Sequence, residues 1–207
     1  MRIFLASQAS HVLHLLTPYL NNDPQDMKCI VISTASNLYP DHPWLDEDLS
    51  KLRELGFNPQ IIDISTYSQD DLEKECKDVD LIFVAGGNTS YLLEQSILSG
   101  FDTIIQSLRS KDMWYVGSSA GSVIAGPNIE YDKLYDEGEF GKTLESYAGF
   151  DLVDFIIVPH ANSPLHRPYI DKSLNMYGDK WKMIELTDDQ AILIDGEKTE
   201  HLSLNQP

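Results

Sequence analysis

The sequence predicts an α/β fold: a three-layer sandwich built on a mostly parallel, doubly wound sheet. Short apolar runs alternate along the chain with segments whose apolar residues recur at helical spacing. Strands that alternate with helices form βαβ units, which give parallel pairing. Because the crossovers of such units are right-handed, helices come to cover both faces of one sheet. The chain has 207 residues, which fits a single domain, and we expect residues 1–207 to form it.

The expected strands are short runs rich in apolar residues. The strongest candidates are residues 2–7, 28–34, 60–64, 80–85, 113–117 and 152–158. Weaker candidates lie toward the C-terminus, at residues 181–186, 190–194 and 201–204.

The expected helices fall between these runs. They are residues 11–20, 45–55, 89–98, 101–110, 120–125 and 167–177. In the first of them we expect Pro18 to kink or restart the helix, because proline donates no backbone hydrogen bond. Gly56 follows the second and suits a helix C-terminus. Residues 126–150 form the longest irregular segment, and loops of that length in a compact domain are often functional.

The chain is strongly acidic: 33 Asp+Glu against 15 Lys+Arg give a formal net charge of −18. A nucleic-acid-binding protein needs a basic surface to meet phosphates, so the charge argues against nucleic acid and equally against anionic membranes. No apolar run is long enough to span a bilayer. Cys29 and Cys76 are too few for a disulfide framework, and the N-terminal run lacks a signal-peptide cleavage pattern. We therefore expect a cytoplasmic protein, either a monomer or a homodimer.

A G-x-S-x-G pattern lies at residues 117–121, Gly-Ser-Ser-Ala-Gly, between an expected strand and an expected helix. Strand, sharp turn and helix are the setting of a nucleophile elbow, in which a strained turn exposes the central serine. Glycines on both sides let the strand and the helix approach closely. Ser119 is the central residue, and we expect Ser118 to point away. The pattern alone is equally compatible with a structural turn in which a serine caps the helix.

A second glycine turn, Gly86-Gly87, follows the expected strand at residues 80–85. Asn88 comes next and can cap the following helix, which is a sufficient structural reason for it. Glycines at the carboxyl end of a strand also leave N–H groups facing the crevice where α/β proteins bind ligands. Acyl transfer needs two such donors for an oxyanion. Ala120, which follows the candidate nucleophile, could supply one, and Gly86 or Gly87 the other.

A serine nucleophile needs a base, and His160 is the best placed of the histidines. It follows the expected strand at residues 152–158, so it belongs to the same edge of a parallel sheet as the two glycine turns. A third group, a carboxylate, should orient the imidazole. Three acidic residues lie between the serine and the histidine in the irregular segment: Asp132, Asp136 and Glu137. The sequence contains no H-E-x-x-H, C-x-x-C or Walker pattern, so we expect neither a metal nor another cofactor.

Four short stretches together resemble the peptidase E family, the alpha-aspartyl dipeptidases of serine peptidase family S51. They are residues 83–89 (FVAGGNT), 117–121 (GSSAG), 127–129 (PNI) and 159–160 (PH). Each is weak alone, but their combination is specific, and the resemblance extends over residues 1–204. It implies a flavodoxin-like sandwich related to class I glutamine amidotransferases, with a serine where those enzymes have a cysteine.

The resemblance also implies roles for single residues. Ser119 is expected to be the nucleophile, His160 the base, and an aspartate from the loop after the nucleophile helix the third member. Asp136 is our choice for that third position and Asp132 the second choice. This loop is about two residues longer here than the family pattern.

A departure from the family concerns substrate selectivity. In the family, selection of aspartate relies on a basic residue after the histidine, but the corresponding segment, residues 161–168, is short here. Arg167 is the one arginine in it. The expected function is a serine peptidase acting on dipeptides or small peptides, with Asp-Xaa dipeptides as one candidate class. Two alternatives stay open: another acyl hydrolase on the same fold, cyanophycinase-like or an esterase, and a non-catalytic binding protein that retains the elbow as a turn.

Overall fold

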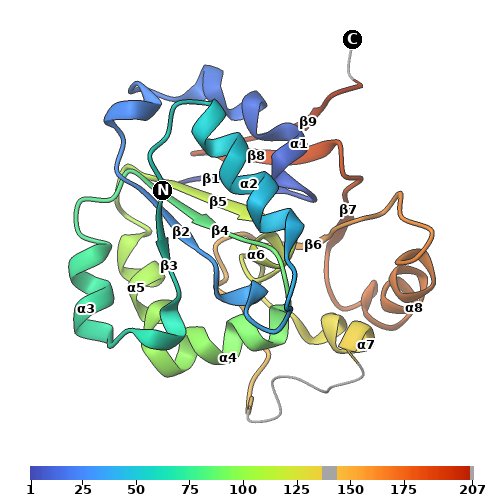
Figure 1. Ribbon diagram of the computed structural model, residues 1–207. Helices are drawn as coiled ribbons and strands as arrows, with labels where there is room; N and C mark the ends of the chain where they lie inside the picture. Colours follow the sequence, from blue (N-terminus) through green and yellow to red (C-terminus); the bar gives the residue numbers. More distant parts are fainter. Residues whose placement is uncertain (137–143, 206–207) are drawn as a thin grey trace.

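A seven-stranded sheet forms the centre of the computed structural model (Figure 1), which describes residues 1–136 and 144–205, the side chains of residues 135 and 136 apart. The strand order is β3-β2-β4-β5-β1-β8-β9. The strands are β1 (Arg2–Ala6), β2 (Cys29–Ile32), β3 (Gln60–Ile62), β4 (Leu81–Val84), β5 (Trp114–Ser118), β8 (Gln190–Asp195) and β9 (Lys198–Ser203). From β3 to β1 every pairing is parallel, whereas β8 pairs antiparallel with β1 and β9 antiparallel with β8. The predicted mostly parallel α/β sheet is confirmed.

A second, two-stranded parallel sheet pairs β6 (Ile156–Val158) with β7 (Met183–Glu185). Both strands were predicted, but they are shorter than the predicted ranges and share no ladder with the main sheet. Residues 152–155 approach β6 as irregular chain.

Helices cover both faces of the main sheet: α1 and α2 lie over one face, and α3, α4 and α5 over the other (Figure 1). Among the described residues the α-helices are α1 (Ala9–Val12), α2 (Pro43–Glu54), α3 (Gln69–Glu75), α4 (Thr89–Ser99), α5 (Phe101–Leu108), α6 (Ala120–Val123), α7 (Lys133–Asp136) and α8 (Arg167–Tyr177). None of these is both long and apolar enough to cross a bilayer.

The two faces of the sheet carry separate hydrophobic clusters. Along β1, Phe4 packs with the cluster under α1 and α2, and Ile3 and Leu5 pack with the cluster under α4 and α5. Successive strand residues point to opposite faces, so a central strand buried on both sides reads as one continuous apolar run. This is why the buried strands were recognisable from sequence.

Two helical segments differ from the prediction. Residues 11–20 were expected to form one helix, but the α-helical turn of α1 passes into a 3-10 helix, Leu13–Tyr19, that contains Pro18. α3 was not predicted, because Leu72 is its single buried residue and gives no apolar periodicity. The feature of the sequence that could have indicated α3 is its N-cap residue, Ser68, whose side chain accepts a hydrogen bond from the Asp71 N–H. Gly56 does follow α2, with φ 97°, as expected at a helix C-terminus.

Candidate active site

The turn between β5 and α6 holds Ser119 in an unusual backbone conformation, with φ 49° and ψ −110°. A non-glycine residue with positive φ costs about 1–3 kcal/mol and persists only where its surroundings enforce it. Here close packing around the turn enforces this conformation. A Cβ at Gly121 would lie 2.0 Å from the carbonyl oxygen of Val84 in β4, and a Cβ at Gly117 would lie 2.6 Å from the backbone of Gly121. The predicted close approach of strand and helix at this turn is therefore confirmed.

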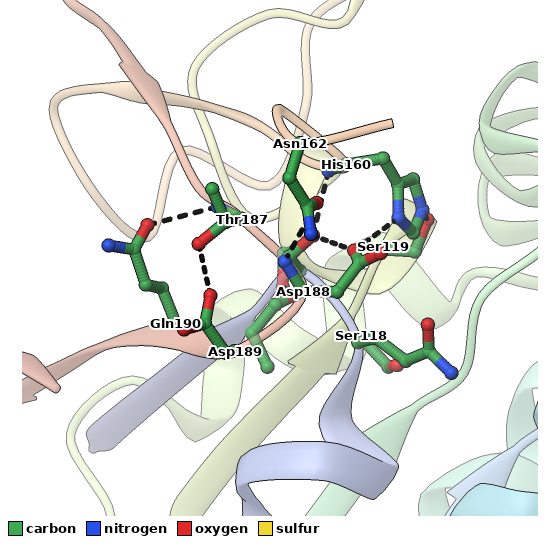
Figure 2. A network of polar contacts seen from close by, with 12 residues as sticks. Ser118, Ser119, His160, Asn162, Thr187, Asp188, Asp189 and Gln190 are labelled. Atoms are coloured by element: carbon green, nitrogen blue, oxygen red, sulfur yellow. Dashed lines mark hydrogen bonds and ion pairs between the residues drawn. The ribbon is translucent and has the colours of Figure 1, made fainter. Parts of the chain in front are cut away.

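The two adjacent serines have different surroundings. Ser118 is buried, and its Oγ accepts a hydrogen bond from the Ala9 N–H at 3.1 Å, at the start of α1. Ser119 Oγ instead lies 2.9 Å from Nε2 of His160 (Figure 2). Of the two hydroxyls, it is thus that of Ser119 that lies within hydrogen-bonding distance of an imidazole.

His160 stands just beyond β6 and links two other side chains. Its Nδ1 lies 2.7 Å from Oδ1 of Asp188, and its Nε2 faces Ser119 (Figure 2). A carboxylate only accepts hydrogen bonds, so Nδ1 carries the proton and the neutral ring presents its lone pair at Nε2. The backbone of His160 is also left-handed, with φ 61°. A hydroxyl, an imidazole and a carboxylate are therefore hydrogen-bonded in series.

Asp188 lies in the turn between β7 and β8. Partial burial raises its pKa, but hydrogen bonds from His160 and Ser7 outweigh burial, and the net effect lowers the pKa of this carboxyl. The Asp188 N–H also donates to Oδ1 of Asn162 at 3.2 Å. Asp188 is thus an ionised carboxylate held in place from several sides.

Asp188 occupies the position that the sequence analysis gave to Asp136. The backbone of Asp136 ends α7, but its side chain lies outside the described residues, as does the whole of Glu137. Asp132, the second choice, lines the cleft. Asp188 was not predicted from sequence, because the carboxylate was expected between the serine and the histidine. A prediction that β8 pairs antiparallel with β1 could have identified Asp188. In that pairing Ala191 lies opposite Ala6, which brings the start of β8 to the carboxyl end of β1.

The glycine turn after β4 lies against Ser119. A Cβ at Gly86 would meet the Ser119 Cβ at 3.2 Å. Gly87 has φ 140°, and a Cβ there would lie 2.1 Å from the Ala35 carbonyl oxygen, so only glycine fits. Among the described residues, no acceptor takes a hydrogen bond from the N–H of Gly87 or of Ala120. Both donors are thus available to a ligand.

Asn88 has the helix-capping role that was predicted as its structural alternative. Its Oδ1 accepts from the Tyr91 N–H at 2.8 Å, and the residue caps the N-terminus of α4. It also lines the cleft, as the sequence analysis expected of a binding residue.

A cleft of about 730 Å³ opens in front of Ser119 and His160. Apolar or aromatic side chains line two of its sides: Tyr39, Pro43 and Trp44 around the start of α2, and Leu165 and Tyr169 around the start of α8. The acidic side chains at its surface are Glu47, Asp132 and Asp188. Neither lysine nor arginine is found among the described residues that line it.

Arg167, the expected aspartate-binding residue, is engaged elsewhere. Its guanidinium pairs with Asp171 on the same helix and with Glu185 in β7. Arg167 is not among the residues that line the cleft. The structure therefore does not bring Arg167 to the site.

Asp48 is a buried acid that lies behind the elbow. It accepts from the Ser10 N–H at 2.7 Å and is hydrogen-bonded to the Ser118 side chain. Burial raises its pKa to about 7, although both hydrogen bonds act in the opposite direction. Asp48 was not singled out from sequence, although its spacing from Leu45, Leu49 and Leu52 places it on the buried face of α2.

Within residues 1–136 and 144–205, no group of three or more His, Cys, Asp or Glu side chains is arranged to hold a metal ion.

Comparisons with known proteins point to one family. The model of peptidase family S51 matches residues 3–202. An uncharacterized peptidase of Listeria monocytogenes is 30% identical over 196 residues, covering 95% of each chain. An uncharacterized peptidase of Pasteurella multocida is 29% identical, covering 95% of this chain and 94% of its own.

Solved structures agree with this match. A crystal structure of a protein from Listeria monocytogenes assigned to peptidase E is 28% identical and superposes with a TM-score of 0.91, covering 99% of this chain and 98% of that one. A peptidase from an acI-B1 actinobacterium, 16% identical, superposes with a TM-score of 0.73 over 98% of this chain and 87% of its own, and shows the fold alone.

The buried acid gives the first prediction, that Asp48→Asn flattens the pH dependence of stability. The folded-state pKa of Asp48, about 7, lies above the ordinary aspartate value of 3.8, so the folded protein binds the proton more tightly. The free energy of unfolding should therefore fall as pH rises between those values, by roughly 4 kcal/mol at most. Urea unfolding at pH 5 and pH 8 should show a smaller difference for Asp48→Asn than for the wild type.

The matched control is Asp46→Asn, the same chemical change at an exposed position of α2. It should leave the difference between pH 5 and pH 8 at the wild-type value. If Asp48→Asn also keeps the wild-type difference, Asp48 is ionised in the folded protein at an ordinary pKa.

Proposed function

Because this chain belongs to peptidase family S51, we propose that it cleaves peptides with Ser119 as nucleophile, His160 as base and Asp188 as the carboxylate that orients the base. The observation that carries the proposal is the series of two hydrogen bonds, Ser119 Oγ to His160 Nε2 and His160 Nδ1 to Asp188 Oδ1. Family membership makes the chain a peptidase of the peptidase E type; the assignment of these three residues rests on their geometry.

Formation of the acyl-enzyme follows from this arrangement. Ser119 Oγ attacks the carbonyl carbon of the scissile bond while Nε2 of His160 takes the hydroxyl proton. The negative charge that develops on the carbonyl oxygen requires two fixed donors. We assign this role to the N–H groups of Gly87 and Ala120, because both residues line the cleft with Ser119 and neither N–H has an acceptor among the described residues. Asp188 stabilises the imidazolium that forms.

Release of the products reverses the direction of proton transfer. Nε2–H of His160 protonates the amine as the C–N bond breaks, which leaves an ester on Ser119. Water then attacks the ester carbonyl, and His160 takes a proton from that water and returns it to Ser119 Oγ. Since protonated His160 cannot act as a base, the rate falls on the acidic side of the pH profile.

The cleft favours neutral or cationic peptides over Asp-Xaa dipeptides. A buried or partly buried substrate carboxylate needs a cation, and the described lining supplies carboxylates instead. Arg167 is held by two acidic partners. Apolar substrate side chains find contact surfaces on Trp44 and Leu165, which both line the cleft. We therefore propose small peptides without an acidic N-terminal side chain as the substrate class.

The second prediction tests the nucleophile. Ser119→Ala removes the attacking oxygen and should lower kcat by at least about 10⁴-fold, as loss of the nucleophile does in other serine peptidases. It should also abolish labelling by a fluorophosphonate probe. Ser118→Ala is the control, because its hydroxyl contacts the start of α1, and it should still be labelled. Labelling that survives in Ser119→Ala would show that another residue is the nucleophile.

The third prediction tests the carboxylate. Asp188→Asn should lower kcat by about 10²–10⁴-fold, because the amide no longer holds the ring in the productive tautomer. Asp189→Asn is the matched control: this neighbour is bonded to Thr187 and Asn205 rather than to His160. Steady-state kinetics on one dipeptide would suffice. If Asp132→Asn or Asp136→Asn is crippling and Asp188→Asn is mild, the third member belongs to the segment chosen from sequence.

The fourth prediction concerns selectivity. Asn-Leu should be cleaved about fivefold faster than Asp-Leu in kcat/KM, because like charges about 4 Å apart in water cost about 1 kcal/mol. Arg167→Ala should leave this ratio unchanged. If Asp-Leu is instead the better substrate and loses about 100-fold in kcat/KM with Arg167→Ala, the arginine leaves its partners and serves an aspartyl pocket.

A further inference from the structure

Ser7 follows β1 directly and is completely buried. Its hydroxyl makes two hydrogen bonds, both with members of the proposed catalytic series. Ser7 Oγ accepts a first hydrogen bond from the His160 N–H at 2.7 Å and donates a second to Asp188 Oδ1 at 2.8 Å. The directions are fixed by chemistry: an ionised carboxylate only accepts and a backbone N–H only donates, so the single hydroxyl proton must point to Asp188.

The first bond acts on the backbone of His160. That residue is left-handed, with φ 61°, a conformation that histidine adopts at a cost. Its carbonyl oxygen accepts from the Ser163 N–H at 2.9 Å, and its N–H is held by Ser7. The backbone of His160 is thus fixed on both sides, which sets where the imidazole leaves the chain.

The second bond acts on the carboxylate. Oδ1 of Asp188 is the same atom that receives His160 Nδ1, so Ser7 places the oxygen that orients the ring. Ser7 is itself fixed, because its N–H donates to the Gln190 carbonyl oxygen at 3.3 Å, at the start of β8. One hydroxyl therefore connects the chain beyond β1, the chain beyond β6 and the turn before β8.

We propose that Ser7 is a positioning residue of the active site. Its hydroxyl fixes His160 and Asp188 relative to each other, so that Nε2 of His160 faces Ser119. This inference rests on the proposed function, since it assigns Ser7 a part in the same reaction. Ser7 transfers no proton and forms no bond with substrate; it acts through the two residues that it holds. Loss of the hydroxyl should therefore slow the chemical step and leave substrate binding nearly unchanged.

The kinetic test compares Ser7→Ala with the wild type. We expect kcat to fall by about 10–100-fold, the loss typical of a catalytic group displaced by about 1 Å or deprived of an outer partner. KM should change by less than about threefold. Ser7→Thr keeps the hydroxyl and should recover most of kcat. A kcat near the wild-type value in Ser7→Ala, or a kcat in Ser7→Thr as low as in Ser7→Ala, would overturn the proposal.

The matched control is Ser96→Ala. Ser96 is also completely buried, and its hydroxyl donates to the Leu92 carbonyl oxygen within α4. It reports what the loss of a buried serine hydroxyl does to stability alone, and its kcat should stay at the wild-type value. Equal losses of kcat in Ser7→Ala and Ser96→Ala would show that the role of Ser7 is structural and would contradict the proposal. If Ser7→Ala does not fold, Ser7→Cys replaces it, because a thiol is of similar size but bonds weakly.

A measurement that needs no turnover separates this proposal from the proposed function. The proton on His160 Nδ1, bonded to a carboxylate, should give a downfield proton NMR signal that Asp188→Ala removes. Ser7→Ala should shift or broaden this signal, and Ser96→Ala should not. An unchanged signal in Ser7→Ala contradicts the role of Ser7 even if the wild type cleaves peptides. If the signal changes in Ser7→Ala but the wild type cleaves no peptide, the positioning role of Ser7 is supported and the proposed function is contradicted.

Discussion

The hydrogen bond between Ser119 and His160 joins two sheets that share no ladder. Ser119 directly follows β5 of the main sheet, and His160 follows β6 of the small one. Asp188 stands where the chain leaves the small sheet and returns to the main sheet as β8. The site is therefore the place where two independently hydrogen-bonded units meet, and its geometry depends on their packing.

Strain in the backbone is concentrated at the same place. Ser119 and His160 are both left-handed, and each conformation costs about 1–3 kcal/mol. The strands behind them offset this cost, since β4 and β6 are entirely buried apolar runs and β5 is buried over its whole length. Rigid strands hold the two turns, and the turns present the two side chains to one another. The same logic explains why glycine is required at position 121, where any side chain would separate α6 from β4.

Much of this arrangement was predictable, because it depends on local patterns. Buried strands read as apolar runs, and Ser119 and His160 were found just after such runs, Ser119 at the centre of a G-x-S-x-G pattern and His160 after a proline. Asp188 was not found, because its position depends on a long-range pairing: β8 runs antiparallel to β1, and only that direction brings the start of β8 to the serine. Arg167 shows a second limit of prediction from sequence. It was selected for its charge and its distance in sequence from His160, but Asp171 and Glu185 decide where its guanidinium lies.

The residues that converge here are widely spaced along the chain: Ser7, Ser119, His160 and Asp188. Because a ribosome synthesises the chain from its N-terminus, Ser119 and His160 are both made before Asp188. The strand β8, which fixes Asp188 beside β1, is made after both. Until β8 has been made and paired, the nascent chain carries the elbow and the imidazole without the carboxylate that His160 Nδ1 contacts in the folded protein.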